Sequence, residues 1–95
     1  MNLDDADMNT ALMVDGNAVA GQLLDVFGRD MTMAMARCAA CATEAAMGAL
    51  MAFTHSPGVV LRCPTCQAAV ARIVETPAAI YIEARGATFL RLPRG

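Results

Sequence analysis

The four cysteines constrain this fold more than any other feature, because they fall into two closely spaced pairs. Cys38 and Cys41 form one C-x-x-C pair, and Cys63 and Cys66 form the other after residues 42–62. Two such pairs about 20 residues apart are the spacing of a zinc ribbon. Two thiolates on a tight loop, here called a knuckle, can reach one ion at about 2.3 Å, and a second knuckle completes a tetrahedron. The sequence therefore predicts a metal site with these four cysteines as ligands.

Four sulfur ligands leave no open coordination position, so the predicted site is structural and carries no catalytic residue. Tetrahedral sulfur sites hold zinc or iron, and rubredoxin uses such an iron site for electron transfer. Rubredoxins and many ribbons place glycine after the second cysteine of each pair, whereas this chain has Ala42 and Gln67. We therefore predict zinc, with iron as the alternative. Two disulfides would require export, and a thioredoxin-like use would need a βαβ context, so neither is favoured.

The size of the chain makes such a metal important for folding. A domain of 95 residues is marginally stable on its core alone, and a bound metal contributes on the order of 10 kcal/mol. Hydrophobic residues make up 57 % of the chain but aromatic residues only 4 %, and all eight methionines lie within residues 1–51. The methionines fill gaps in a thin core, or they form an apolar surface for a partner. Filling the core is the simpler interpretation.

Charge is distributed unevenly along the chain. Residues 1–30 carry six aspartates against Arg29 alone, a net charge of −5, whereas residues 31–95 carry six arginines against three glutamates, a net charge of +3. The arginines are dispersed, there is no lysine, and the sequence pI is about 5.1. Nucleic-acid-binding domains instead cluster basic residues on one face. Nucleic acid is therefore disfavoured as a partner.

No segment predicts membrane insertion or export. The longest uncharged run, 45–61, is interrupted by the polar turn at 54–58 and is shorter than the roughly 20 apolar residues of a spanning helix. The acidic start, with Asp4, Asp5 and Asp7, is unlike a signal peptide. Reduced cysteines are needed as ligands, so we expect a cytoplasmic protein without membrane contacts.

The N-terminal part divides into an acidic arm, 1–14, and an amphipathic helix, 15–28. Asp15 and Asn17 offer side chains for the N-terminal cap, and Gly28 is a typical C-terminal cap. Ala20, Leu23, Leu24 and Phe27 recur at helical spacing and predict one apolar stripe, which the ribbon's sheet would cover. Gly21 lowers helix stability by about 1 kcal/mol relative to alanine, which predicts a close approach of another backbone there.

Residues 29–95 read as a β domain. Alternating or β-branched stretches predict strands over 31–37, 49–54, 59–62, 69–75, 79–85 and 88–92. A turn at 55–58 folds one hairpin back so that the second knuckle meets the first, and turns at 76–78 and Gly86 close a three-stranded meander. The predicted fold is a single small, mainly-β domain: a zinc-ribbon or rubredoxin-like antiparallel sheet with one N-terminal amphipathic helix.

Other reactive side chains do not form a recognisable site. His55 and Ser56 are the only histidine and serine, and no acid is placed to orient them, so they predict no nucleophile and base. Tyr81, the single tyrosine, alternates with Ile80 and Ile82 and lies on the more polar face of its strand. No glycine-rich phosphate loop is present. We expect no catalytic or organic-cofactor-binding residue and no enzymatic activity.

The segment 14–21, then Phe27-Gly28, the two C-x-x-C pairs and the stretch 57–64 together resemble a bacterial family of small zinc-ribbon proteins of unknown function. The likeness extends from Val14 to Pro93. It implies a ribbon with a short N-terminal helix and no known activity, and it keeps an oxidoreductase among the candidate partners. Members of that family have glycine after each knuckle, where this chain has Ala42 and Gln67.

The leading prediction is a non-enzymatic zinc-binding ribbon that acts as a protein-interaction module or an accessory subunit of a larger complex. The helix stripe and the methionine-rich strands would be its contact surface, and a homo-oligomer is compatible with it. The second prediction is a rubredoxin-like electron carrier that serves an oxidoreductase and uses its acidic arm for docking. The third is a nucleic-acid-binding ribbon, which the charge pattern disfavours.

Overall fold

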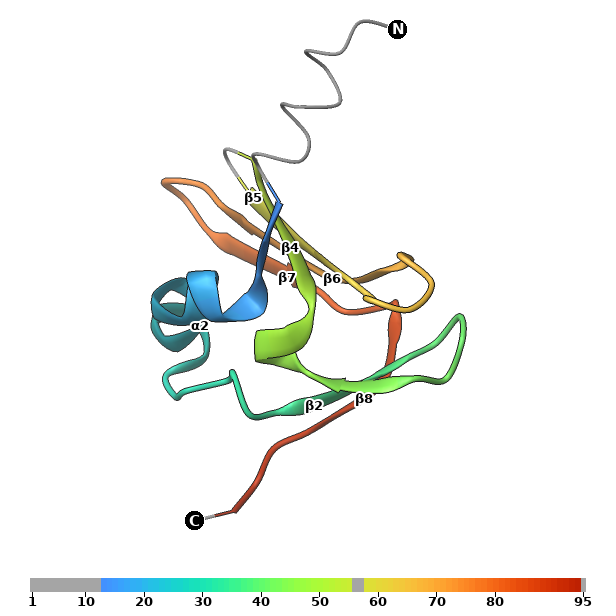
Figure 1. Cartoon of the computed structure of the whole chain (residues 1–95). Coiled ribbons are helices and arrows are strands. Elements are labelled where there is room, and N and C mark those ends of the chain that lie inside the picture. The colour runs from blue at the N-terminus through green and yellow to red at the C-terminus, as the bar shows by residue number, and fades with distance from the viewer. Residues whose placement is uncertain (1–12, 56–57, 95) are drawn as a thin grey trace, which may run out of the picture.

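The computed structural model describes residues 13–55 and 58–94 (Figure 1). Most of the predicted acidic arm and the centre of the predicted turn at 55–58 lie outside the described residues. Two short 3-10 helices, η1 and η2, one α-helix and eight strands follow in the order β1 Met13–Asp15, η1 Gly16–Val19, α2 Ala20–Phe27, β2 Met35–Cys38, β3 Glu44–Ala46, η2 Met47–Ala49, β4 Met51–His55, β5 Gly58–Arg62, β6 Ala69–Glu75, β7 Ile80–Glu83 and β8 Ala87–Arg91.

The N-terminal helix forms where the sequence predicts it, as η1 followed directly by α2. The Asp15 side chain accepts a hydrogen bond from the Ala18 N–H at 3.2 Å and caps the first turn. Gly28 ends α2 in the left-handed conformation, at φ 73°, and its N–H donates to the Leu24 carbonyl. Both ends of the helix are therefore encoded locally.

Two details of the helix differ from the prediction. Leu23 is fully buried, but Leu24 is 47 % exposed, so the apolar stripe is narrower than the sequence suggests. No atom lies within 4 Å of the point where a Cβ on Gly21 would sit, so the expected close backbone approach is absent there. Gly16 makes that approach instead, because a Cβ on it would collide with the Met47 carbonyl. The helical spacing of apolar residues predicts which face of the helix is buried, but it does not predict how many residues of that face are covered.

Five strands form the larger antiparallel sheet, in the order β1-β4-β5-β6-β7. The β4–β5 hairpin pairs Met51 with Arg62 and Phe53 with Val60, and β5 continues into β6 through the second knuckle. Ala52, Val59, Leu61 and Ile73 are buried on the face that α2 approaches. Beta-branched and small apolar residues at every second position thus form one covered face.

The last strand belongs to a second sheet, and the predicted three-stranded meander is wrong. The smaller sheet has the order β3-β2-β8, so β8 leaves β7 and pairs with β2. The chain makes this change at Gly86, whose carbonyl accepts from the Ala39 N–H and whose missing side chain lets it lie against Ala69 and Val70. Alternation along 88–92 indicated a strand but carried no information about its partner. Strands β1 and β3 were not predicted, and β2 begins at Met35 although the sequence predicted a strand from residue 31.

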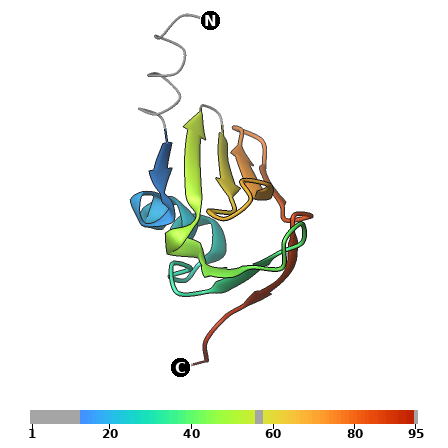
Figure 2. The same ribbon diagram turned by 45° about the vertical axis from the view of Figure 1, so that its right-hand side comes forward.

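The two sheets and α2 enclose one core. Figure 2 shows the strands of the larger sheet standing above those of the smaller sheet, with α2 at one side. Met31 and Met47 are buried, which confirms the core-filling interpretation for these two, whereas Met33 is 69 % exposed. The buried residues are Val19, Leu23, Met31, Ala34, Ala36, Cys38, Met47, Leu50, Ala52, Val59, Leu61, Cys63, Val70, Ala71 and Ile73.

The core is small and rich in alanine, as the composition predicts. It lacks any aromatic residue among its buried members, and Phe27 only packs against its edge.

None of the helices in the described residues combines the length and apolar character needed to cross a membrane.

Candidate metal centre

The two sheets place the two knuckles side by side. The first knuckle, 38–43, connects β2 to β3, and the second, 63–68, connects β5 to β6. Figure 1 shows these loops, one green and one golden, next to each other at the edge of the molecule opposite α2. Each sheet therefore supplies one pair of cysteines, which is why residues distant in sequence meet at one point.

The sulfur atoms lie at the spacing of a tetrahedral metal site. All four Sγ atoms are within 4.8 Å of one another. The Sγ atoms of Cys38 and Cys66 are 3.6 Å apart, and those of Cys41 and Cys63 are 3.7 Å apart. A tetrahedron with metal–sulfur bonds of about 2.3 Å has edges of about 3.8 Å. The four predicted ligands are thus brought together, and their arrangement fits a metal ion.

The backbone of the two knuckles is closely matched. Cys38 exchanges hydrogen bonds within its loop, donating its N–H to the Thr43 carbonyl at 2.9 Å and accepting from the Ala42 N–H at 2.8 Å. Cys63 makes the same two bonds at the same lengths with Ala68 and Gln67. Irregularities in strand register occur between Arg37 and Cys38 and between Leu61 and Arg62, just before each knuckle. Such bulges re-aim the side chains that follow them.

The knuckles keep glycine-like geometry without glycine. Ala42 has φ 65° and Gln67 has φ 67°, and among the described residues no other non-glycine residue has a positive φ. This left-handed conformation costs a residue with a Cβ about 1–2 kcal/mol. The absence of glycine from both positions therefore leaves the loop shape unchanged and adds backbone strain at the metal centre.

Burial differs between the members of each pair in the same way. Cys38 and Cys63, the first cysteine of each knuckle, are buried and belong to the hydrophobic core. Cys41 and Cys66, the second cysteine of each knuckle, are exposed. One side of the site is consequently continuous with the core, while the other side reaches the protein surface.

Cys41, in the first knuckle, ionises readily. The Thr43 hydroxyl, and after it the Thr43 backbone N–H, lower the pKa of the Cys41 thiol to about 6. The Sγ atom of Cys41 lies 3.2 Å from the Thr43 hydroxyl oxygen. Thr43 was not among the predicted site residues, although a hydroxyl residue two positions after a ligand is a signal for this contact. A thiolate at Cys41 is the form that binds metal.

The second knuckle ionises less evenly. Burial acts to raise the pKa of Cys63, but the N–H groups of Cys66 and Thr65 outweigh it and lower that pKa. The Ala68 N–H lowers the pKa of Cys66, whereas burial and the three neighbouring thiols outweigh it and raise that pKa to about 12. Four close thiols resist successive ionisation because their negative charges repel one another. A bound divalent cation offsets that repulsion, so the cluster is suited to a metal ion.

The comparison with protein families agrees with the resemblance in the sequence. The model of a family of unknown function, DUF6510, matches residues 7–95, which include both knuckles, the helix and both sheets. The chain belongs to DUF6510. No curated protein and no solved structure matches the chain. Membership in DUF6510 therefore supports an uncharacterised domain family and adds no activity to what the site indicates.

Away from the knuckles, this DUF6510 protein has a groove beside α2. The groove has a volume of about 310 Å³, and its lining is more apolar than polar. The lining residues are Asn17, Ala20, Gly21, Leu24, Asp30 and Thr32. Asp30 accepts hydrogen bonds from the N–H of Thr32 at 2.9 Å and from its hydroxyl at 2.7 Å, and these two bonds lower its pKa. Asp30 therefore holds a negative charge at the rim of an apolar groove.

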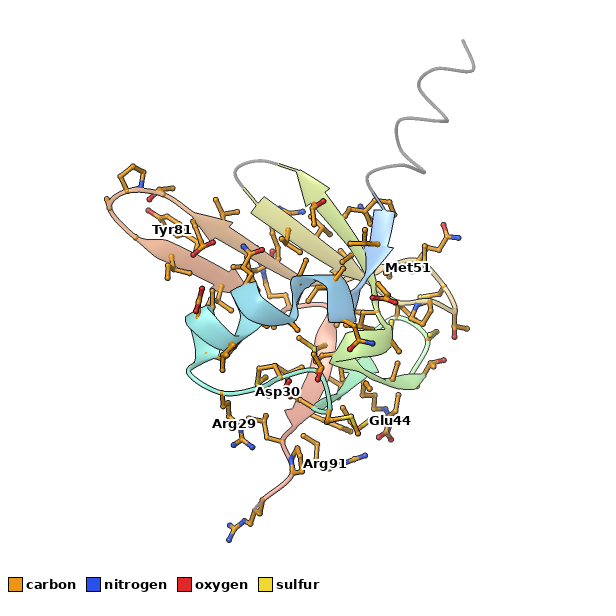
Figure 3. The ribbon with its side chains drawn as sticks, turned by 60° about the vertical axis from the view of Figure 1, so that its left-hand side comes forward. Arg29, Asp30, Glu44, Met51, Tyr81 and Arg91 are labelled. Atoms are coloured by element: carbon orange, nitrogen blue, oxygen red, sulfur yellow. The ribbon has the colours of Figure 1, made fainter. Side chains whose placement is uncertain are left out.

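Of the other side chains that the sequence singles out, the structure describes Tyr81. Tyr81 lies on the β6–β7 hairpin, at the end of the molecule away from Glu44 and Arg91, as Figure 3 shows. Ser56 and the side chain of His55 lie outside the described residues. Within the part of the chain that the structure describes, four cysteines are the group that could hold a metal.

Proposed function

We propose that this DUF6510 protein is a non-enzymatic zinc-binding ribbon that works as a small protein-interaction module or accessory subunit in the cytoplasm. The observation that carries the proposal is the four-cysteine cluster, because four thiolates at tetrahedral spacing leave no position for a substrate. Zinc is proposed because it prefers tetrahedral sulfur ligands and has no redox chemistry of its own. Its need for reduced thiols supports a reducing compartment.

The position of the cluster supports a structural role for the metal. Each knuckle belongs to a different sheet, so an ion held by all four cysteines would tie the smaller sheet to the larger one. The core between the sheets is small and alanine-rich, so hydrophobic burial alone contributes little to holding the two sheets together. Cys38 and Cys63 would anchor the site in the core, and Cys41 and Cys66 would close it from the surface.

The groove beside α2 is the proposed contact surface for a partner. Leu24 is half exposed there, and Gly21 keeps the groove open because it has no side chain. Leu23, Met31 and Met47 are buried, so the exposed part of the helix stripe, at Leu24, is the part proposed for this surface. Asp30 places a negative charge at the rim. The partner that fits is a protein segment with one apolar anchor followed or preceded by a basic residue.

A specific observation also favours a second candidate, the rubredoxin-like electron carrier. The exposed Cys41 and Cys66 would bring an iron site to the surface, where an electron can pass to a partner. The Thr65 N–H points at the Cys63 sulfur at 3.4 Å, and hydrogen bonds to sulfur raise the potential of iron–sulfur sites. Zinc remains the first proposal, because four sulfur ligands suit zinc as well as iron and no residue of the site is diagnostic of iron.

The metal is tested by elemental analysis and a visible spectrum of protein purified without added metal or chelator. We expect close to one zinc per chain and no colour. Close to one iron per chain, with sulfur-to-iron charge-transfer bands that bleach on reduction, would instead establish the electron carrier. Cys63→Ser is the control, because a site with three thiolates should lose most of its metal.

The contact surface is tested with a peptide display library selected on the metal-loaded protein. We expect enrichment of peptides that pair a large apolar residue with arginine or lysine. Leu24→Asp should abolish their binding, while Leu92→Asp, which changes an exposed leucine outside the groove, should not. Peptides that bind Leu24→Asp and the parent protein equally would contradict the proposal.

A further inference from the structure

Strand β7 forms an edge of the larger sheet and exposes an unusual amount of apolar surface. Ile80 and Ile82 are each 49 % exposed and Tyr81 is 61 % exposed. Ile80 and Ile82 lie on the face that α2 approaches, opposite Glu75 and Ile73, while Tyr81 lies on the other face. The predicted alternation is therefore correct, but neither face of β7 is covered. Within the described residues, β7 pairs only with β6.

The backbone of β7 also offers hydrogen-bonding groups to the outside. The Thr76 N–H donates to the Ala79 carbonyl at 2.8 Å, so residues 76 and 79 face each other across the hairpin as a hydrogen-bonded pair. Hydrogen-bonded and non-hydrogen-bonded pairs alternate along an antiparallel ladder. Tyr81 and Glu83 consequently bond to β6, and the N–H and C=O groups of Ile80 and Ile82 point away from it.

The two edges of the same sheet differ in their charge. Strand β1 has three residues and ends in the charged Asp15, whereas β7 has four residues and ends in Glu83, whose charge is paired with Arg85. Natural edge strands are commonly shortened, bulged or given a charge or proline to prevent pairing with another chain. The stretch Ile80-Tyr-Ile82 contains no charge, proline or bulge. An edge with free backbone groups and apolar side chains on both faces is suited to strand addition.

We propose that the free edge of β7 pairs with β7 of a second copy of this chain, antiparallel, across a two-fold axis beside Tyr81. Ile80 would then form hydrogen-bonded pairs with the partner's Ile82, and Ile82 with the partner's Ile80. Tyr81 would face the partner's Tyr81 as a non-hydrogen-bonded pair, in which side chains lie closest. Aromatic and β-branched cross-strand pairs are among the favourable ones. The two five-stranded sheets become one continuous sheet.

The charges around β7 favour a second copy over a charged partner. Glu83 and Arg85 form an ion pair with each other, 3.5 Å from Nε to Oε1, so the edge carries no net charge that would attract an acidic or basic protein. In the proposed register Glu83 lies opposite the partner's Ala79, and no like charges oppose each other. A neutral surface that is complementary to itself is what a two-fold interface requires.

The proposal is tested by the mass of the metal-loaded chain in solution, measured by light scattering or sedimentation over a range of concentrations. We expect twice the mass of one chain at high concentration. Ile82→Lys and Ile80→Lys should each reduce it to the mass of one chain, because a lysine would be opposed across the two-fold axis by apolar side chains. Met33→Lys is the matched control, a more exposed apolar residue outside the strand, and should leave the dimer intact.

Tyr81 provides a second measurement on the unaltered chain. It is the only tyrosine, so a dityrosine bond formed with a photo-oxidant must join two copies at this residue. We expect a fluorescent, non-reducible dimer that is absent from Ile82→Lys and from Tyr81→Phe. This result would decide the matter even if Ile82→Lys failed to fold.

Three outcomes would overturn the proposal: a single-chain mass at every concentration, a dimer that survives both lysine variants, or a dimer lost equally in Met33→Lys. None of them depends on which metal the chain holds. Elemental analysis of each variant separates the two questions, since a dimer with iron would contradict the proposed zinc site alone, and a monomer with zinc would contradict the β7 interface alone.

Discussion

The two ends of the molecule are stabilised in different ways. At the helix end, α2 is capped on both sides, and Leu23 is fully buried against the larger sheet. At the knuckle end, two loops carry strained left-handed residues, Ala42 and Gln67, around four crowded thiols. Burial and regular hydrogen bonds maintain the first end. At the second end, the proposed metal ion would maintain the shape, because coordination bonds can offset the backbone strain of the two knuckles.

The largest expected effect comes from removing the metal. Treatment with a strong chelator, or Cys63→Ser, should lower the free energy of unfolding by on the order of 10 kcal/mol and unfold the chain at ordinary temperature. The physical reason is that the metal–sulfur bonds that would join the two sheets at one point are then lost. Circular dichroism and thermal unfolding, with and without added zinc, measure this. An unchanged melting temperature after chelation would show that burial alone stabilises both ends.

A smaller effect is expected from the core of the helix end. Leu23→Ala should lower the free energy of unfolding by about 2–5 kcal/mol, because it leaves a cavity between α2 and the sheet. Leu24→Ala is the control and should cost less stability, because the Leu24 side chain is half exposed. Denaturant unfolding monitored by circular dichroism gives both values, and elemental analysis should find the metal retained. Equal losses for the two variants would contradict the packing described for α2.

The strain in the knuckles predicts a gain in stability. Ala42→Gly and Gln67→Gly should each raise the free energy of unfolding by about 1 kcal/mol, because glycine adopts a positive φ without steric cost. Ala40→Gly, in the same loop but without a positive φ, should give no gain. Thermal unfolding of the metal-loaded variants is the measurement. A loss in both variants would mean that the Ala42 and Gln67 side chains contribute contacts that exceed the strain.

The smallest expected effect is at Gly21. Gly21→Ala should stabilise the protein by about 0.5–1 kcal/mol, since alanine favours the helix and its Cβ meets no atom within 4 Å. Gly16→Ala is the contrasting variant, because its Cβ would collide with the Met47 carbonyl and should destabilise the protein. Denaturant unfolding compares them. If Gly21→Ala also weakens peptide binding, Gly21 is retained to keep the groove open.

Local signals in the sequence predicted several elements well. Asp15 and Gly28 mark the ends of the helix because capping needs side chains or φ values at single positions. The stretch 69–75 predicted β6 with its bounds, since β-branched residues there leave one conformation favoured. The grouping of the four cysteines was also predicted, because a knuckle places its two cysteines three positions apart, and the structure brings all four Sγ atoms within 4.8 Å of one another.

Non-local features could not be predicted in the same way. Alternation in 88–92 indicated a strand, yet the partner of β8 depends on where Gly86 lets the chain cross to β2. Leu23 and Leu24 are the same residue type, but Leu23 is buried in the core whereas Leu24 lines the groove and is half exposed. The packing of α2 against the rest of the molecule decides this difference. The exposure of Ile80, Tyr81 and Ile82 likewise follows from the place of β7 at the edge of its sheet.

The sequence by itself determined the two cysteine pairs, the capped helix and the mainly-β class, because each depends on the types and spacing of residues a few positions apart. Only the tertiary structure decided that the smaller sheet takes β8, that the knuckles come from different sheets, and that β7 is left with a free edge. Those features depend on which elements pack against the same small core, and such packing joins elements that are far apart in the chain.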